Sequence, residues 1–299
     1  MRLRLGARGS ALSLAQAALV TRALGGEAAV ELVVVRTTGD RRSAEGAPIS
    51  WKGDFTRELD EALLDGRIDL AVHSLKDVPS ALPDGLLLAA VPEREDPRDV
   101  LVAEPRRGFA DLPRGARVGT SSPRRRAQLR RARSDLDIVE ARGNVDTRIR
   151  RLREGRFDAL VLARAGLARL GRVDEIADVF DEGVLLPAVG QGALAIVTRR
   201  EGVPDAMRRL DHAASHAEVL AERAFLAGLE AGCRAPVAGR ARVSGSRLEF
   251  TGAVFSEDGA TELRASGSGG AAGAEGIGRR AAQELLARGA ADLIEARGA

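Results

Sequence analysis

Short apolar runs alternate with helix-forming stretches along the first two thirds of the chain, and this alternation limits the sequence to few folds. The expected strands cover residues 3–5, 31–36, 68–72, 86–91, 138–141, 159–163 and 193–197. The expected helices cover residues 11–24, 54–65, 123–133 and 146–154. Strands that alternate with helices are typical of largely parallel sheets joined by helical crossovers. We therefore predict an α/β protein with mixed, mostly parallel sheets.

The two halves of this α/β region repeat each other in sequence. "LLDGRIDLAV" at 63–72 resembles "LREGRFDALV" at 152–161, since both read as a helix end, a Gly, an Arg and a buried strand. Two further pairs keep the same order along the chain, 5–16 with 118–128 and 34–40 with 139–146. The repetition predicts two similar lobes that face each other across a cleft, with ligands at the carboxyl ends of the strands.

Segments rich in Pro and Gly mark the predicted domain boundaries. "PEREDPRD", around 92–100, reads as a charged hinge, and "LLPAVGQGA" at 185–193 reads as a second crossing back to the first lobe. Beyond it the pattern changes to a helix near 214–229, strands at 236–243, 247–255 and 261–267, and a helix from 273. We predict three domains, namely residues 1–92 with 193–212, residues 97–187, and a smaller α+β domain at 213–299.

The N-terminal segment and the cysteine content favour a cytoplasmic protein. Early arginines and a later apolar run leave a secretory signal as an alternative. Leu3 and Leu5 alternate with arginines, however, and Ser10 stands at a helix N-cap position, which favours a strand followed by a helix. No stretch approaches the ~20 apolar residues of a membrane span. The single cysteine excludes a disulfide within the chain, and with only three histidines it argues against a metal site. We expect a monomer without metal or membrane association.

The strongest electrostatic feature is "VGTSSPRRRAQLRRAR" at 118–133. Ser122 as N-cap and Pro123 at the first helical position predict a helix start. Thr120, Ser121 and Ser122 then offer hydroxyls beside free backbone N–H groups at the positive end of the helix, which is a suitable place for an anion. Arg124 and Arg125 lie in the first turn, where the helix dipole disfavours cations unless an anion is bound.

A solvated basic face with nucleic acid as partner is the alternative for this segment. The chain has no Tyr, one Trp and seven Phe, so side chains on which bases could stack are scarce. This scarcity favours a small polyanion and argues against nucleic acid as partner. "ARGNVDTRIRRL", with Arg148, and "GARGS", with Arg8 and Ser10, repeat the strand, turn and helix arrangement. Each alone reads as an ordinary turn, but together they favour a ligand with several carboxylates, which Arg binds bidentately.

"AVHSLKDVPS" at 71–80 contains one of only two lysines among the 46 basic residues. Lys76 and Asp77 follow the predicted strand 68–72 and would lie at its carboxyl end. A surface turn with a weak ion pair is the plain interpretation. The scarcity of Lys argues instead for a position that needs a compact cation, with Asp77 as general acid or counter-ion. Lys52 stands in a Gly-containing loop that could cover the cleft.

Cys233 lies in "LEAGCRAPVAG", after a predicted helix and beside Gly232 and Pro236. A lone Cys is usually a small buried apolar residue. A Gly- and Pro-containing loop next to Arg234 would instead favour an accessible thiolate. The residues alone leave both interpretations open. They offer no Cys/His dyad, so acyl transfer of the hydrolase type is not indicated.

Seven segments together resemble one enzyme family. In chain order they are "GARGSALSLAQ", "AVHSLKDVP", "EREDPRDVLV", "VGTSSPRRRAQL", "RGNVDTR", "LPAVGQGA" and "EAGCRAPV". The sequence is similar to that of the porphobilinogen deaminases (hydroxymethylbilane synthases), from residue 3 into the C-terminal domain. The resemblance implies three α/β domains, of which the first two are like periplasmic binding proteins. It also implies an activity that joins four porphobilinogen molecules head to tail into hydroxymethylbilane, with release of ammonia, in tetrapyrrole synthesis.

The resemblance also implies the cofactor and the residues of the site. A dipyrromethane made from substrate would be held by a thioether to Cys233, and Asp77 would be the catalytic carboxylate, with Ser74 and Lys76 beside the cofactor. Acetate and propionate groups of the cofactor and substrate would be bound by Thr120, Ser121, Ser122, Arg124, Arg125, Arg148 and Lys52. The substrate side would be lined by Arg8, Ser10, Gln16 and Gln191.

The sequence departs from the family pattern at a few positions. Pro48 stands where another Lys is common, Trp51 is unusual in that loop, and Ala231 replaces the commoner Gly. The segment after residue 171 does not align cleanly, which leaves the role of Arg172 open. Beside the enzyme, two other hypotheses follow from the residues. The lobe repetition fits a non-catalytic anion-binding protein, and the arginines at 124–133 fit a nucleic-acid binder.

Overall fold

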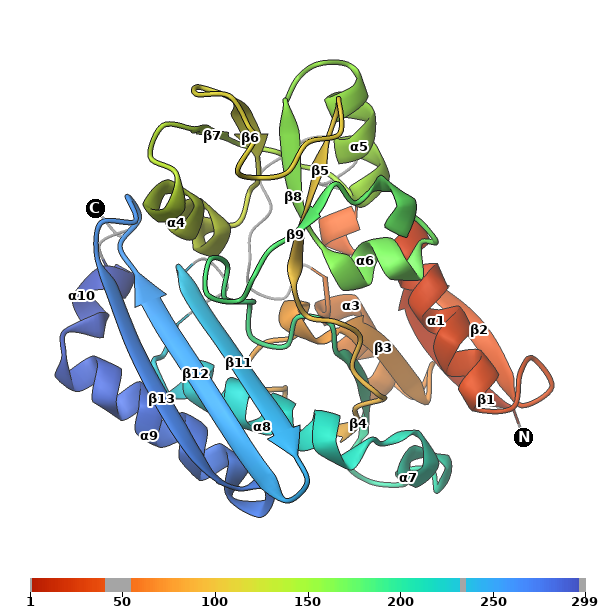
Figure 1. The fold of residues 1–299 in the computed structure, drawn as a ribbon. Coiled ribbons are helices and arrows are strands. Elements are labelled where there is room, and N and C mark those ends of the chain that lie inside the picture. The colour runs from red at the N-terminus through yellow and green to blue at the C-terminus, as the bar shows by residue number, and fades with distance from the viewer. Residues whose placement is uncertain (1, 41–54, 232–234, 296–299) are drawn as a thin grey trace. The chain divides into compact units, whose positions relative to one another are not determined.

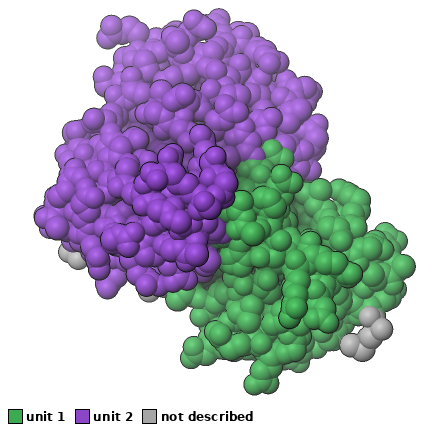
Figure 2. Space-filling model, turned by 60° about the horizontal axis from the view of Figure 1, so that its bottom comes forward, with its two compact units in different colours: residues 1–95, 192–216 green, residues 96–191, 217–299 purple. Residues whose placement is uncertain are grey.

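The computed structural model describes residues 2–40, 55–231 and 235–295. Internal contacts divide the chain into two compact units, residues 1–95 with 192–216 and residues 96–191 with 217–299 (Figure 2). Each unit contains a five-stranded sheet, and the second unit also contains a three-stranded sheet. The chain leaves the first unit and returns to it in the two segments that the sequence indicates as crossings.

The sheet of the first unit has the strand order β2-β1-β3-β10-β4 (Figure 1). Its strands are β1 (Leu3–Arg8), β2 (Val30–Val35), β3 (Leu70–Ser74), β4 (Leu86–Ala90) and β10 (Leu194–Arg199). β1 pairs in parallel with β2 and β3, whereas β10 runs antiparallel to both β3 and β4. Four of the five strands therefore point the same way. The helices are α1 (Ala11–Ala23), α3 (Arg57–Leu64) and α7 (Ala206–Leu210), with a short 3₁₀ turn η1 (Leu75–Asp77) after β3.

The second unit repeats this arrangement in the strand order β7-β6-β8-β5-β9. Its strands are β5 (Asp99–Ala103), β6 (Arg117–Gly119), β7 (Asp137–Val139), β8 (Ala159–Ala163) and β9 (Asp178–Val179). β6 pairs in parallel with β7 and β8, and β5 runs antiparallel to β8 and β9. Its helices are α4 (Pro123–Ala132), α5 (Val145–Arg153) and α6 (Arg164–Arg169), with a short turn η2 (Val173–Glu175). The repetition in sequence therefore corresponds to two sheets of the same topology.

One glycine in each sheet lets a helix-facing side chain approach the strand. A Cβ on Gly6 of β1 would lie 2.3 Å from the Ile68 side chain and 2.9 Å from that of Leu59 on α3. A Cβ on Gly119 of β6 would lie 2.6 Å from Leu160 and 3.1 Å from Phe157. These four distances are shorter than ordinary van der Waals contacts, so a larger residue at either position would force the neighbouring side chains to shift. The two positions correspond in the repeated segments 5–16 and 118–128.

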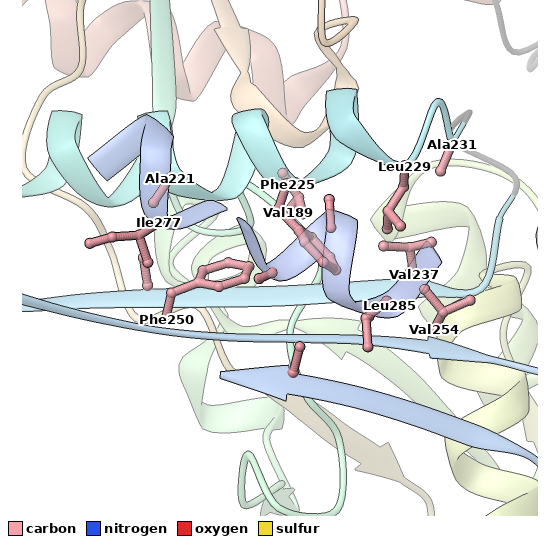
Figure 3. Close-up of a cluster of buried hydrophobic side chains, with 14 of the residues drawn as sticks. Val189, Ala221, Phe225, Leu229, Ala231, Val237, Phe250, Val254, Ile277 and Leu285 are labelled. Atoms are coloured by element: carbon pink, nitrogen blue, oxygen red, sulfur yellow. The ribbon is translucent and has the colours of Figure 1, made fainter. Parts of the chain in front are cut away.

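The C-terminal part of the second unit packs helices on an antiparallel sheet. The strands β11 (Val237–Ser244), β12 (Arg247–Phe255) and β13 (Glu262–Gly270) form a meander, and the helices are α8 (Ala213–Gly228), α9 (Ala274–Ala287) and α10 (Ala290–Glu295), with a turn η3 (Ala271–Gly273) before α9. Figure 3 shows Phe225 of α8 and Phe250 of β12 in the apolar core between them, with ring centroids 5.0 Å apart. Leu229 and Ala231 extend this core up to the last described residue before Cys233.

The fold class predicted from the sequence is confirmed, with corrections in detail. Helix 11–24 and the C-terminal strands match their elements within one to three residues. The sequence reading missed the antiparallel strand β5, because the charged residues just before it were interpreted as a hinge that continued to residue 100. The predicted helix 54–65 begins at Arg57 with Thr56 as N-cap residue, and its expected cap, Asp54, lies outside the described residues.

Candidate active site

A small polar hollow lies at the carboxyl ends of β1 and β3 in the first unit. These two strands are parallel neighbours, so their ends meet at one edge of the sheet, where α1 also begins. The hollow is lined by Arg8, Ser10, Leu12, Ser13, Gln16, Phe55, Thr56, Val72, His73, Ser74 and Asp77. Five residues predicted from the sequence are thus brought together here: Arg8, Ser10, Gln16, Ser74 and Asp77.

Arg8 is held by a carboxylate that the sequence reading did not single out. Its Nε and one terminal nitrogen donate to Asp40, and its guanidinium lies 3.9 Å from the centre of the Phe55 ring. Burial alone would raise the pKa of Asp40, but the hydrogen bonds and charge of Arg8, together with Thr37, hold it below its ordinary value. The edge of the guanidinium formed by its two terminal nitrogens still has N–H groups for a further anion.

The start of α1 supplies hydroxyl groups and a positive helix end to the same hollow. Ser10 is the N-cap, as the sequence predicts, and its Oγ accepts from the Ser13 backbone N–H at 3.3 Å. Ser13 Oγ in turn accepts from the Arg8 backbone N–H at 3.0 Å. One turn further, Gln16 donates to Ser74 Oγ at 2.7 Å and so connects α1 with the end of β3. These bonds fix the polar side chains on the floor of the hollow.

The turn η1 carries the two charged residues of the "HSLKD" segment. Lys76 and Asp77 are both exposed, and Asp77 lines the hollow. The preceding Leu75 is 1% exposed and its backbone N–H donates to the Ala193 carbonyl at 3.0 Å, so the turn is anchored to the sheet. The carboxylate of Asp77 is therefore presented by a fixed turn while remaining accessible to a ligand.

The hydroxyl groups predicted as an anion cradle lie at the start of α4 in the second unit. Ser122 is the N-cap and accepts from the Arg125 backbone N–H at 3.4 Å, with Pro123 as first helical residue. Ser121 Oγ donates to the Ala141 carbonyl at 2.6 Å, and Thr120 is 1% exposed. Among the three, Ser121 and Ser122 are partly accessible at the helix end.

Arg124 and Arg125 are buried and share the carboxylate of Asp99, whereas the sequence predicted a bound anion beside them at the start of the helix. Arg124 donates to Asp99 Oδ2 at 2.7 Å, and Arg125 donates to Asp99 Oδ1 from Nε at 2.9 Å and from a terminal nitrogen at 2.7 Å. Gln191 also donates to Asp99 Oδ1, at 2.9 Å, and to the Pro97 carbonyl at 2.6 Å. Burial alone would raise the pKa of Asp99, but the two arginines lower it to about 2. The cluster keeps a net positive charge beneath the start of α4.

Sequence reasoning could not find Asp99, since this residue is distant from α4 along the chain and lies in the segment interpreted as a hinge.

Arg148 of α5 donates from Nε to the Gly143 carbonyl at 2.7 Å, and Asn144 caps the same helix. Arg172, whose role the sequence left open, is ion-paired with Asp146 and with Glu175 at 2.6 Å. Cys233, Lys52, Pro48 and Trp51 lie outside the described residues.

His73 is one of the lining residues that the sequence did not point to. It precedes Ser74 in β3 and is 5% exposed, and its Nε2 has no hydrogen-bond partner among the described residues. Its place in a strand next to Ser74 was the only sequence feature that could have pointed to it.

Within the same described ranges, no group of His, Cys, Asp or Glu is arranged to hold a metal ion. No described helix combines the length and apolar character needed to cross a bilayer.

Two family models match the chain. One, described as "Porphobilinogen deaminase, dipyromethane cofactor binding domain", covers residues 3–222, and the other, "Porphobilinogen deaminase, C-terminal domain", covers residues 216–287. The chain belongs to the porphobilinogen deaminase family.

Curated members of the family are closely similar in sequence to this chain. The porphobilinogen deaminase of Rubrobacter xylanophilus is 54% identical over 87% of this chain and 86% of its own length. That of Syntrophobacter fumaroxidans is 46% identical over 93% and 92%.

Solved structures also resemble the fold, at low identity. The Bordetella pertussis BvgS VFT2 domain has a TM-score of 0.39 and 19% identity, over 70% of this chain and 84% of that domain. The sulfate-bound OxyR2 regulatory domain of Vibrio vulnificus has a TM-score of 0.40 and 16% identity, over 70% and 92%. Likenesses of this size do not bear on the function.

The described residues fit the cofactor that gives the first family domain its name. A dipyrromethane built from porphobilinogen carries carboxylate side chains and pyrrole N–H groups. The hollow offers Arg8 and the start of α1 to carboxylates, and Asp77 to a pyrrole N–H. The unpartnered Nε2 of His73 shows that the lining is not satisfied by the protein alone.

Proposed function

We propose that this chain is a hydroxymethylbilane synthase, a deaminating transferase that joins four porphobilinogen molecules head to tail and releases ammonia. One observation carries the proposal: a single hollow gathers Arg8, Ser10, Gln16, Ser74 and Asp77. The chain that forms this hollow matches the dipyrromethane-binding domain of the family over residues 3–222. The protein would act in the cytoplasm as a monomer, without nucleic acid, membrane or metal. Its domains would be 1–92 with 193–212, 97–187 and 213–299.

Asp77 would be the catalytic group. When ammonia leaves porphobilinogen, positive charge develops on the pyrrole ring and its nitrogen. A carboxylate held beside the ring N–H stabilises that charge, and it does so best when its position is fixed before the reaction. The anchored turn η1 provides such a position, and the neighbouring Lys76 would hold a ligand carboxylate as a compact cation.

The remaining site residues would bind the carboxylates of cofactor and substrate. Arg8, Ser10, Gln16 and Ser74 would do this in the first lobe. Thr120, Ser121, Ser122 and Arg148 would do it in the second lobe, with Lys52 and Gln191. Arg124 and Arg125 would contribute the net positive charge that remains after their pairing with Asp99. Arginine-rich lobes suit a product whose carboxylates increase in number with every ring added.

The cofactor would be attached to Cys233 through a thioether. The thiolate is the reactive form of the side chain, and the adjacent Arg234 favours it. When bound, the dipyrromethane supplies the acceptor ring to which the first porphobilinogen is joined. Ser74, Lys76 and Asp77 would orient it from the first lobe.

Turnover of porphobilinogen by the purified protein tests this function. We expect a linear tetrapyrrole and four molecules of ammonia for each product. Asp77→Asn is expected to lower kcat by a hundredfold or more, as for the loss of a charge-stabilising group. The exposed Asp84 lies a few residues further and gives a matched control, since Asp84→Asn should leave kcat unchanged. Tight binding of porphobilinogen without ammonia release would support an anion-binding protein instead.

A further inference from the structure

The side chain of His73 is fixed at the edge of the candidate active site by the strand that carries it. β3 is a central strand, and His73 pairs in register with Ala195 of β10. It is the second-last residue of β3, so its imidazole stands where the sheet ends and the hollow begins. The pairing with β10 holds the backbone of His73 in place at this edge of the sheet.

The imidazole is buried, yet its Nε2 makes no hydrogen bond to the described residues. The residue is 5% exposed, and Nε2 has no partner among the described residues. Buried polar atoms in folded proteins nearly always have a partner, because an unsatisfied one loses its hydrogen bonds to water without replacement. The hollow is therefore built for a polar guest.

The charge state of His73 restricts what that guest can gain from it. Burial, and secondly the nearby charge of Arg8, lower the pKa of His73 to about 4. The imidazole is thus neutral near pH 7 and presents one donor and one acceptor nitrogen. It contributes a directed hydrogen bond and no charge of its own.

The surroundings favour a carboxylate as the guest. Arg8 supplies a cation, and Ser10, Leu12 and Ser13 place the positive end of α1 against the hollow. Asp77 lies on the rim, where it serves the pyrrole N–H in the function proposed above. An ammonium group next to His73 would be repelled by Arg8, whereas a carboxylate could accept from Nε2–H and from the guanidinium together.

We propose that His73 contacts the substrate directly, with Nε2 donating to one carboxylate side chain of the pyrrole while Arg8 binds the same carboxylate. This role rests on the proposed function. It makes His73 a residue that selects for a substrate carrying that carboxylate, because a site built to hydrogen-bond one group rejects analogues that lack it. The contact is present before and during the reaction, so it affects KM and hardly affects kcat.

Two variants separate contact from structure. His73→Leu removes the hydrogen bond but keeps an apolar side chain of similar size, and His73→Gln keeps an N–H near the position of Nε2. The probe is a pyrrole that bears acetate and propionate side chains but no aminomethyl group, so that it binds without reacting. Its affinity for the holoenzyme is measured by calorimetry, together with the Tm of each variant and kcat and KM for porphobilinogen.

We expect His73→Leu to bind the pyrrole diacid about tenfold more weakly, with an unchanged or higher Tm and a KM raised to a similar extent. His73→Gln should recover most of the affinity. Replacing the carboxylate that His73 contacts by an amide should weaken binding to the wild-type protein more than binding to His73→Leu, in which only the contact of that carboxylate with Arg8 remains to be lost.

Unchanged affinity in His73→Leu would overturn the proposal, and so would a parallel loss of affinity and Tm in both variants. If the wild-type protein turns over porphobilinogen and His73→Leu has the same affinity and kinetics, only the role of His73 is refuted. A wild-type protein that neither binds the diacid nor reacts with porphobilinogen would refute the proposed function.

Discussion

The guanidinium of Arg8 has one edge on Asp40 and one face on Phe55. Asp40 is itself held by Thr37, whose Oγ1 donates to its Oδ2 at 2.8 Å. The planar fork of an arginine loses much of its freedom when one edge is bound bidentately, so the remaining edge is oriented in advance for a ligand. In the function proposed above, Asp40 would therefore act on the substrate through Arg8, as a positioning residue.

Removing the charge of Asp40 tests this role. We expect Asp40→Asn to raise KM for porphobilinogen about tenfold and to change kcat by less than threefold, since Arg8 would be less well oriented but the reacting groups would be intact. Asp40→Glu should restore part of the affinity. Steady-state kinetics of the three proteins are the measurement. Equal KM values would show that Arg8 does not depend on Asp40.

Local sequence was informative about some site residues and silent about others. Ser10 and Ser122 were predicted as N-caps because the cap preference is a local property. The partners of the arginines were not predictable in this way. Asp40 and Asp99 reach Arg8, Arg124 and Arg125 only after the sheets have formed, and no local pattern encodes such pairs. His73 escaped notice because a lone His in an apolar strand is usually an ordinary buried residue.

At the scale of elements, α3 contains a carboxyl group in an unfavourable place. Asp60 is 6% exposed, and burial, with a smaller effect of Glu61, raises its pKa to about 6. The pKa of Asp60 in the folded protein therefore lies above its value near 3.8 in the unfolded chain. The folded state is therefore penalised for the ionised carboxylate at pH 8, and the penalty disappears as the pH falls through 6 towards 4.

Asp60→Asn should consequently increase the free energy of unfolding at pH 8, by about 2 kcal/mol, and by much less at pH 4.5. Urea denaturation at the two pH values measures the difference. Glu27→Gln, an exposed change in the same unit, provides the control and should show little effect at either pH. A gain for Asp60→Asn that is the same at both pH values would contradict the ionised state of Asp60.

The start of α4 depends on a carboxylate from another element. Asp99, the first residue of β5, is the counter-ion of two buried guanidinium groups. Asp99→Asn should lower the free energy of unfolding by about 3–5 kcal/mol, because it leaves two buried cations without their partner. Asp158→Asn removes a surface pair with Arg117 and should cost less than about 1 kcal/mol. Similar losses in both variants, measured by urea denaturation, would refute the importance of the buried cluster.

Strand and helix alternation predicted most elements of the two lobes but missed strands such as β5 and β9, and it did not predict how the strands pair. The sequence repetition foretold lobes of one kind, and the two sheets indeed share one strand order. In each sheet the single antiparallel strand, β5 or β10, follows directly after a crossing segment. Periodicity cannot reveal the direction of a strand within its sheet, since a buried strand has the same apolar pattern in either direction.

At the scale of the whole molecule, the central claim is that one chain carries its own cofactor on its single cysteine. The apolar core of the C-terminal part includes Leu229 and Ala231 (Figure 3), and Cys233 stands two positions after Ala231 in the sequence. The first unit contains a hollow that Asp77 helps to line, and residues 3–222 match a dipyrromethane-binding domain. Both features concern the same covalent adduct, whose mass is accessible to experiment.

The most direct test is the intact mass of the purified protein, for the wild type and for Cys233→Ser. A dipyrromethane captured by the thiolate adds roughly 400 Da. We predict this increment on the wild-type chain and its absence from Cys233→Ser, with Cys233 of the wild type protected from alkylation. A wild-type chain that keeps its unmodified mass and an alkylatable Cys233 after incubation with porphobilinogen would contradict the account, as would the same increment on Cys233→Ser.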